Sequence, residues 1–388
     1  MNDNIIIIRY GELHLKGKNR GFFEKMLIDN IRKALEGVEC KTRFNRSRYE
    51  VFDYTDEIEI IERLKKVFGI HSISVAKKCA ADIDAICEVV KGYASEMSGT
   101  FKVNTNRADK RYPFTSVEVS AKAGGAILSV NHKLGVDVHN PQIIINVDIR
   151  EDGCAYIFKD KIACAGGMPV GTAGKGMLLL SGGLDSPVAA YMMAKRGLKL
   201  TAIHFHSYPY TSEMAKQKVI DLARILVDYT GPMDLICIPF TKIQEEIHKY
   251  CESNYMITIV RRFMMRIAER VAKLNNCGCL VNGESLAQVA SQTLHSITVT
   301  NDIVKSMPIF RPCIGMDKQE IIEISYKIKT YETSILPYED CCTVFLPDSP
   351  VTRPTIIKAE IEERKMGDFE PLIKEAIENR EIIHIEKI

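Results

Sequence analysis

The sequence contains no tryptophan, and only 7% of its 388 residues are aromatic. It also has no long hydrophobic run, since the four isoleucines of Ile5–Ile8 end at Arg9. Such a stretch suits a short β-strand and is too short for a signal peptide or a membrane span. We therefore expect a cytoplasmic protein that does not enter a membrane.

An excess of charge of one sign is also missing, because 52 Lys and Arg residues face 50 Asp and Glu residues. A neutral total does not exclude nucleic acid, since a basic face can be hidden within it. Basic residues do cluster before Arg48, and again at 101–114, where Tyr112 and Phe114 lie among them. Cations between aromatic rings suit phosphate contact and base stacking. Solvated charge on strand edges is the alternative that composition alone leaves open.

The 12 cysteines do not form the pattern of a secreted disulfide framework. We expect most of them to be reduced and buried as small apolar side chains. Two pairs stand out because their members are close in sequence: Cys277 with Cys279, and Cys341 with Cys342.

The chain is longer than one typical domain, and its pattern changes after a glycine-rich stretch. We interpret residues 166–175 as a linker, because they contain four glycines and no apolar periodicity. From 176 to 388, apolar strands alternate with amphipathic helices. This alternation predicts an α/β domain, a doubly wound parallel sheet covered on both faces.

Residues 1–165 have a mixed α+β pattern, which we divide into units at 1–57 and 58–165. Helices are expected at 22–36 and 57–69. Strands are expected in the remaining apolar stretches, including the alternating segment 116–127, "SVEVSAKAGGAI".

The segment "LLLSGGLDSPVAA" (178–190) has the outline of a nucleotide site without the lysine of a Walker loop. Gly182 and Gly183 let the backbone approach an anion, and the following helix presents free N–H groups to it. Ser181 and Ser186 add hydroxyl donors. Asp185 suits a Mg²⁺ ion that accompanies phosphate. A plain structural turn is the simpler alternative.

Ser-Gly-Gly-x-Asp-Ser after a strand resembles the pyrophosphate loop of the PP-loop ATP pyrophosphatases. Four further motifs narrow the resemblance to the tRNA 4-thiouridine synthetases: "RYGELHLKGKNRGFFE" (9–24), "NGESLAQVASQT" (282–293), "GMDKQEII" (315–322) and "LPYEDCC" (336–342). This resemblance covers essentially the whole chain. It implies an α+β ferredoxin-like unit at 1–57, an α+β THUMP RNA-binding domain at 58–165, and a PP-loop domain at 176–388.

The resemblance implies a tRNA sulfurtransferase reaction that consumes ATP and Mg²⁺. The enzyme would adenylate O4 of uridine 8 in tRNA, and sulfur from a cysteine persulfide would then displace AMP. The implied partners are tRNA and a cysteine desulfurase, and the family tends to form homodimers. The basic clusters then become candidate RNA contacts: Lys16, Lys18, Arg20, Lys102, Arg107, Lys110 and Arg111.

The ATP site is expected beyond the carboxyl ends of the strands. Backbone at the first two strand ends should meet adenine and ribose, at Leu179, Leu180, His204 and Phe205. The pyrophosphate should lie on Ser181, Gly182, Gly183, Asp185 and Ser186. Arg261, Gly283 and Gln292 match the family's ATP pocket, with Arg262 as the rival of Arg261.

The resemblance suggests that Lys318 stabilises the adenylation transition state, with Asp317 holding it or Mg²⁺. Together with Asp185, it is a candidate catalytic residue. Cys341 and Cys342 are the candidate sulfur site, and we favour Cys342 as the carrier. The C-terminal rhodanese domain of long family members has no counterpart here, which questions a second role in sulfur supply for the thiamine thiazole. Direct transfer from a desulfurase is our hypothesis.

An iron–sulfur cluster is a further candidate cofactor, and two other functions are alternatives to tRNA thiolation. Cys277-Gly-Cys279 is one residue shorter than the Cys-x-x-Cys of PP-loop thiolases that hold a [4Fe–4S] cluster, so buried packing is favoured over a cluster. No metal ligand set is assigned. The alternative functions are a PP-loop ligase that adenylates a small molecule, and a non-catalytic RNA-binding protein.

Overall fold

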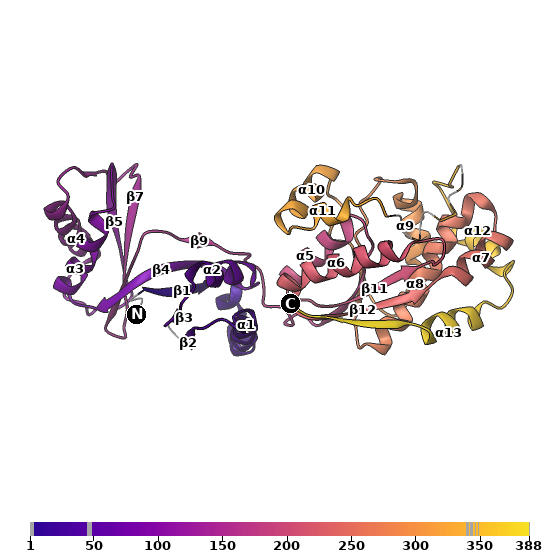
Figure 1. The fold of residues 1–388 in the computed structure, drawn as a ribbon, viewed down its shortest axis with the longest axis horizontal. Helices are drawn as coiled ribbons and strands as arrows, with labels where there is room; N and C mark the ends of the chain where they lie inside the picture. Colours follow the sequence, from indigo (N-terminus) through magenta and orange to yellow (C-terminus); the bar gives the residue numbers. More distant parts are fainter. Residues whose placement is uncertain are drawn as a thin grey trace. The chain divides into compact units, whose positions relative to one another are not determined.

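The computed structural model describes residues 4–44, 49–338, 341, 344, 345, 347 and 349–387, without the side chains of His14 and Leu15. The chain forms two compact units (Figure 1). The first comprises Met1–Leu15 and Ile31–Gly166, and the second comprises Lys16–Asn30 and Gly167–Ile388. A short helix, η1 (Glu12–Asn19), and α1 (Arg20–Ala34) lie between the first strand and the second. No helix in the described ranges is long and apolar enough to cross a membrane.

The first unit is built on one sheet of nine strands. Its order is β2 (Lys41–Phe44), β3 (Tyr49–Phe52), β1 (Asn4–Tyr10), β4 (Ile70–Ala80), β8 (Cys154–Phe158), β7 (Ile143–Ile149), β5 (Thr100–Arg107) and β6 (Gly135–Val136). A short strand, β9 (Ile162–Ala163), also pairs with β4.

Strand β4 joins the two halves of this sheet. Its residues from Ile70 to Lys77 pair with β1, and those from Lys77 to Ala80 pair with β8. The ladder therefore continues without a gap from the N-terminal half of the sheet into the half that follows. The division of the chain at residue 57 stays a prediction.

Helix α2 (Glu57–Lys66) precedes β4, while α3 (Ile83–Ala94) and α4 (Ser116–Val130) cover β5, β7 and β8. The predicted strand at 116–127 is wrong, because this segment forms α4. Thr115 and Glu118 close a capping box at its start, and Val119, Ala123 and Ile127 are buried at helical spacing of four. Val117 suggests the alternating apolar pattern of a strand, but its side chain is 79% exposed and takes no part in the buried face.

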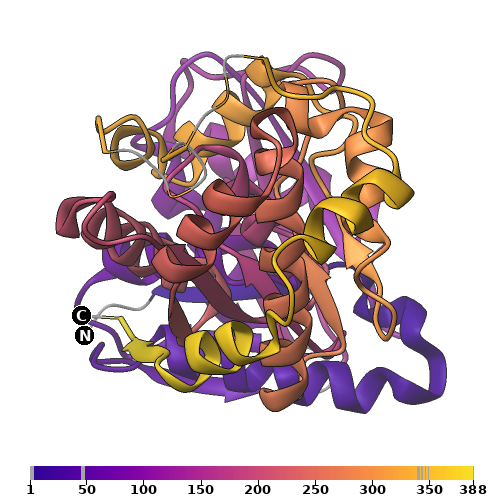
Figure 2. The same cartoon turned by 90° about the vertical axis from the view of Figure 1, so that its right-hand side faces the viewer.

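The second unit contains the predicted parallel sheet. Its order is β14 (Ile309–Phe310), β13 (Cys279–Val281), β10 (Lys175–Leu179), β11 (Lys199–His206), β12 (Met233–Pro239) and β15 (Glu381–Ile385). The first five strands are parallel, and β15 pairs antiparallel with β12. Figure 2 shows the C-terminal segment that carries β15 in yellow. The strand order reverses at β10, because β11 pairs on one side and β13 on the other.

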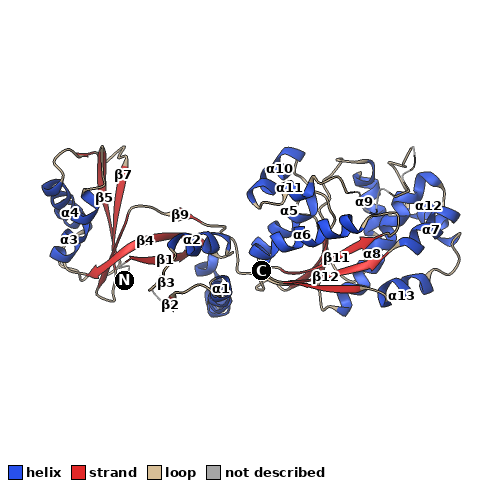
Figure 3. Cartoon of the chain, viewed as in Figure 1, coloured by secondary structure: helices blue, strands red, loops and turns tan. Residues whose placement is uncertain are grey.

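Helices lie on both sides of this sheet, so the prediction of a doubly wound α/β domain is confirmed (Figure 3). α5 (Asp185–Lys195) and α6 (Glu213–Thr230) pack together next to β10 and β11. α7 (Thr241–Tyr250), α8 (Met256–Leu274) and α13 (Glu370–Glu378) contribute to the hydrophobic cluster on β10–β12. The remaining helices are α9 (Leu294–Asn301), α10 (Lys318–Lys327), α11 (Tyr331–Ser334) and α12 (Ile356–Arg364).

The glycine-rich stretch before β10 is held against the end of α5. The N–H groups of Gly171 and Ala173 both donate to the carbonyl of Gly197, at 2.8 and 3.0 Å. At Gly167, an added Cβ would lie 2.2 Å from the carbonyl oxygen of Lys195. Glycine is required at that position because the backbone approaches so closely and φ is +75°.

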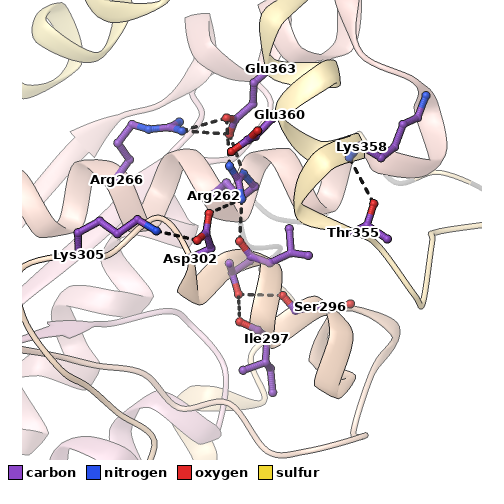
Figure 4. A network of polar contacts seen from close by, with 12 residues as sticks. Arg262, Arg266, Ser296, Ile297, Asp302, Lys305, Thr355, Lys358, Glu360 and Glu363 are labelled. Atoms are coloured by element: carbon purple, nitrogen blue, oxygen red, sulfur yellow. Dashed lines mark hydrogen bonds and ion pairs between the residues drawn. The ribbon is translucent and has the colours of Figure 1, made fainter.

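A buried ion-pair network connects α8 to α12 (Figure 4). The Arg262 side chain is 2% exposed, and its Nε donates to Glu363 at 2.9 Å. Its Nη1 donates to the carbonyl of Val299 at 2.8 Å, and Arg266 also reaches Glu363, at 3.0 Å. Arg262 is therefore committed to the packing of helices.

We expect Glu363→Ala to lower the free energy of unfolding by about 3–5 kcal/mol, because the buried guanidinium of Arg262 loses its hydrogen-bonded carboxylate. The other carboxylate near it, that of Asp302, is 3.9 Å away. Urea unfolding followed by circular dichroism measures this loss, since the chain has no tryptophan. The control is Glu370→Ala, which breaks the more exposed Arg270–Glu370 pair and should cost less than about 1 kcal/mol. Equal losses in the two variants would contradict the expectation.

Candidate active site

A cavity of about 190 Å³ opens at the carboxyl ends of β10, β11 and β13, where the strand order reverses. Ligands of open α/β sheets bind at such a point. Its lining residues come from the three strand ends, from α8, and from the segments around 292 and 341. They are Leu179, Leu180, Ser181, Asp185, Ser186, Ile203, His204, Phe205, Arg261, Met264, Met265, Asn282, Gly283, Glu284, Gln292 and Cys341.

The loop after β10 folds around Ser181 and Ser186. The N–H of Ser181 donates to Ser186 Oγ at 3.0 Å, and the two hydroxyls lie 3.2 Å apart. The N–H of Gly183 donates to Ser181 Oγ at 3.3 Å. Asp185 and Ser186 begin α5, so the positive end of the helix dipole lies at the loop. This geometry suits an anion such as phosphate.

Gly283, after β13, packs directly on this loop. A Cβ at Gly283 would lie 2.7 Å from the carbonyl carbon of Asp185 and 2.7 Å from the nitrogen of Ser186. Both are backbone atoms, so no side-chain movement could relieve the overlap. The start of α5 can therefore approach β13 only because residue 283 has no side chain.

Asp185 is bound by two side chains from other segments. Lys318 Nζ lies 2.9 Å from Asp185 Oδ1, and Gln288 Nε2 donates to Oδ2 at 3.0 Å. Lys318 is the first residue of α10, where a cation opposes the helix dipole, and the carboxylate of Asp185 offsets that cost. Asp317 does not hold Lys318 in this structure. It caps α10, accepting from the N–H of Glu320 at 2.9 Å.

Arg261 lies on the wall of the cavity and shares a carboxylate with Arg311. Its Nη2 contacts Glu284 Oε1, while Arg311 Nε donates to Glu284 Oε2 at 2.6 Å. Glu284 is 2% exposed, so two guanidinium groups face one buried carboxylate and leave the wall with net positive charge. The structure separates Arg261 from its rival Arg262, whose side chain belongs to the network with Glu363.

The strand-end residues meet the cavity largely through backbone and packing. His204 is buried, and its Nδ1 lies 3.0 Å from the carbonyl of Leu180. Gln292 ends the short helix η3 (Ala290–Gln292) and is 8% exposed. Its Oε1 is buried and has no hydrogen-bond partner among the described residues, so it can accept a hydrogen bond from a ligand.

Cys341 lies at the edge of the same cavity and is 3% exposed. Its carbonyl accepts from Gln244 Nε2 at 2.8 Å. Cys341 also lines a second, smaller cavity together with Gly182 and Tyr338. The favoured sulfur carrier, Cys342, lies outside the described residues.

The candidate RNA-binding residues lie in both units, and each set is described separately. Lys16 and Lys18 end η1, with Lys16 Nζ 5.2 Å from the ring centre of Phe23, and Arg20 pairs with Glu24 at 2.8 Å. Lys102 and Arg107 are on β5, and Lys110 and Arg111 follow it.

Within the second set, Arg107 supports the loop that follows β5. Its Nη1 donates to the carbonyls of Tyr112 and Phe114, each at 2.9 Å. Arg111 forms an exposed pair with Asp109 at 3.0 Å, while Lys110 is exposed. Lys110 is therefore better placed than Arg107 to offer its charge to a ligand.

Cys277 and Cys279 are buried beside the start of β13, away from the carboxyl end where the cavity opens. Burial raises the pKa of both thiols, that of Cys279 to about 11. In the part of the chain that the structure describes, no group of three His, Cys, Asp or Glu side chains is arranged to hold a metal ion.

Several residues at the site escaped the sequence reasoning. Glu284 and Gln288 lie inside the quoted motif "NGESLAQVASQT", which could have pointed to them. Arg311 and Lys218 lie in segments with no recognisable motif. The side chain of Lys218 lies next to Gly182, where an added Cβ would be 3.3 Å from Lys218 Cδ.

Fold and site together define the class of protein: a PP-loop nucleotide-binding domain preceded by ferredoxin-like and THUMP domains. The chain belongs to the family described as thiamine biosynthesis protein (ThiI), whose model matches residues 171–367. The ThiI ferredoxin-like domain matches residues 5–74, and the THUMP domain matches residues 80–158.

Similar proteins cover nearly the whole chain. A "Probable tRNA sulfurtransferase" of Alkaliphilus oremlandii is 50% identical over 388 residues, which is 98% of each chain. One of the same name from Brevibacillus brevis is 49% identical over 99% of this chain and 97% of its own. The crystal structure of a 4-thiouridine synthetase–RNA complex with bound ATP is 36% identical, with a TM-score of 0.90 over 99% of this chain and 100% of that one.

Gly283→Ala should weaken ATP binding, because its Cβ would displace the start of α5. Loss of one hydrogen bond to a charged phosphate corresponds to a Kd raised about tenfold or more. Isothermal titration with ATP measures the change. In the control, Gly278→Ala, the added Cβ would lie 3.9 Å from its nearest neighbour, the carbonyl of Lys175. An unchanged Kd for Gly283→Ala would show that the loop tolerates the overlap.

Proposed function

We propose that this protein is an ATP-dependent tRNA sulfurtransferase that converts uridine 8 of tRNA to 4-thiouridine. One observation carries the proposal: the Ser181–Ser186 loop, the Asp185–Lys318 pair and Cys341 meet around a single cavity. The names of the relatives that match almost the whole chain support it. So does the ATP bound in the 4-thiouridine synthetase–RNA complex.

In the first step, O4 of the uracil attacks the α-phosphate of ATP, and pyrophosphate leaves. The N–H groups and hydroxyls of the Ser181–Ser186 loop bind the leaving group. Lys318 is held by Asp185 next to this loop, where its charge stabilises the transition state. The adenine and ribose occupy the cavity between the ends of β10 and β11, where Gln292 Oε1 can accept a hydrogen bond.

In the second step, the terminal sulfur of a cysteine persulfide attacks C4 of the uracil, and AMP leaves. An external thiol, such as that of free cysteine, then attacks the carrier sulfur and breaks the S–S bond, which releases 4-thiouridine and leaves a mixed disulfide on the carrier cysteine. A uracil oxygen is a poor leaving group, and its adenylation makes the displacement at C4 possible. Cys341 lines the nucleotide cavity, and Cys342 follows it directly. We assign the persulfide to this pair and favour Cys342 as the carrier. A ligase acting on small molecules has no need of a thiol at this position.

The residues fit a Mg²⁺ ion that arrives with the nucleotide phosphates. Mg²⁺ is commonly held by one or two carboxylates together with phosphates. Asp185 supplies such a carboxylate at the pyrophosphate loop, where the ion would share it with Lys318 and Gln288. Glu284 is buried between two guanidinium groups, those of Arg261 and Arg311. The ion would neutralise phosphate charge beside Asp185.

The remaining partners follow from the proposed reaction. The tRNA binds to basic residues of the N-terminal half, and a cysteine desulfurase supplies the persulfide. We propose a homodimer that acts in the cytoplasm, where its tRNA substrate is present. The family description also names thiamine biosynthesis, and sulfur supply for the thiazole is a candidate second role.

The direct test combines the protein with ATP, Mg²⁺, cysteine, a desulfurase and unmodified tRNA. The proposal expects pyrophosphate release that depends on tRNA, together with 4-thiouridine, which retards tRNA on a mercury-containing gel. Release without tRNA would indicate a ligase for a small molecule. Binding of tRNA with no release would indicate a non-catalytic RNA-binding protein.

Lys318→Met should slow tRNA-dependent pyrophosphate release by about 10²-fold, the effect of removing one preorganised charge from a transition state. The rate is measured with saturating ATP and tRNA. Lys327→Met, at the other end of α10, is the matched control and should keep the wild-type rate. A rate that Lys318→Met leaves unchanged would remove this residue from the adenylation step.

Lys110→Ala should weaken tRNA binding and reduce the slope of log Kd against log salt by about 0.7–0.9, as expected for one lost phosphate contact. Filter binding at several salt concentrations measures the slope. The control is Lys374→Ala on α13, an exposed lysine near Glu378. An identical slope for Lys110→Ala and wild type would exclude a phosphate contact by Lys110.

A further inference from the structure

Lys218 is a buried lysine in the middle of α6. It is 5% exposed, on the same helix as the buried Val219 and Leu222. Burying an ammonium group costs free energy unless the group is hydrogen-bonded. Its Nζ donates to the carbonyl of Leu336 at 2.8 Å. The lysine therefore ties α6 to Leu336, which is 118 residues away and precedes Cys341 by five positions.

The stem of the same lysine packs on the pyrophosphate loop. A Cβ at Gly182 would lie 3.3 Å from Lys218 Cδ, 3.4 Å from Cε and 3.6 Å from Nζ. The absence of a side chain at Gly182 leaves room for this lysine. Among the described residues that line the nucleotide cavity Lys218 is absent, and its ammonium donates to the carbonyl of Leu336.

The segment around Cys341 has further anchors, and two of them are on α7. Gln244, which is 3% exposed, donates to the carbonyl of Cys341 at 2.8 Å, and Ser207 Oγ donates to Gln244 Oε1. The ring of Phe345 stacks on His248 with centroids 4.7 Å apart. Of these anchors, Lys218 is the one that also contacts the pyrophosphate loop among the described residues.

We infer that Lys218 is a positioning residue that docks the segment carrying Cys341 onto the pyrophosphate loop. The inference rests on the proposed function and adds to it: sulfur transfer depends on Lys218 more than adenylation does. A displacement of about 1 Å between reacting groups can cost about 10²-fold in rate. When sulfur is misplaced, water attacks C4 of the adenylated uridine and expels AMP. Uridine is restored, and ATP is consumed without thiolation.

The test is the amount of 4-thiouridine formed for each pyrophosphate released. Lys218→Met keeps most of the stem against Gly182 but cannot donate to Leu336. In Lys218→Met the ratio should fall about tenfold or more, because the misplaced sulfur reacts more slowly with the adenylated uridine. The rate of pyrophosphate release and the KM for ATP should change little. A general loss of structure would lower the rate and leave the ratio unchanged.

Lys216→Met is the matched control, because Lys216 is on the same helix and pairs with Glu381 on β15. Its ratio should equal that of wild type. Gln244→Leu removes a different anchor, the donor to the Cys341 carbonyl, and should also lower the ratio. If Lys218→Met fails to fold, Gln244→Leu becomes the deciding variant. An unchanged ratio in Gln244→Leu would then overturn the inference.

Two other results would overturn the role of Lys218. A wild-type ratio in Lys218→Met would show that the hydrogen bond to Leu336 does not place the sulfur. A fall in pyrophosphate release with the ratio unchanged, in a variant whose circular dichroism and unfolding match wild type, would assign the lysine to the nucleotide instead. Absence of tRNA-dependent release in the wild-type protein would refute the proposed function itself, which keeps the two failures distinct.

Discussion

Parallel pairing of β10 with both β11 and β13 is the constraint on which the candidate site depends. It brings three strand ends to one point and leaves a cavity between them. The contact of Gly283 with the backbone of Asp185 and Ser186 then sets how closely α5 approaches β13. The other side chains of the site, including those of Lys318 and Arg261, lie around these strand ends and the start of α5.

At the site, oppositely charged side chains from distant parts of the chain form small clusters. Asp185 faces Lys318, while Glu284 is shared by Arg261 and Arg311, which leaves a positive surplus for phosphate. Arg262 lies next to Arg261 on α8, but its pair with Glu363 of α12 stabilises the packing of the two helices. Adjacent arginines of one helix thus serve two different purposes, because successive side chains of a helix point about 100° apart.

What could be predicted from the sequence was local. The Ser181–Ser186 loop, the strands that flank it and the start of α10 at Lys318 follow from short patterns of glycine, apolar and capping residues. Segment 116–127 misled because Val117 and Val119 alternate as in a strand, although its capping box specifies a helix. Lys218 and Arg311 could not be predicted, because their partners are far away in the chain and only the folded sheet brings them together.

The shared strand β4 has a consequence for how the N-terminal half can be handled. Because β4 completes the ladder on both of its sides, a fragment that begins after residue 80 would expose β8 as a bare sheet edge. Unprotected edges recruit other strands and cause aggregation. The sheet of the first unit is thus one continuous structure, and a cut at the border between its two family domains would divide it.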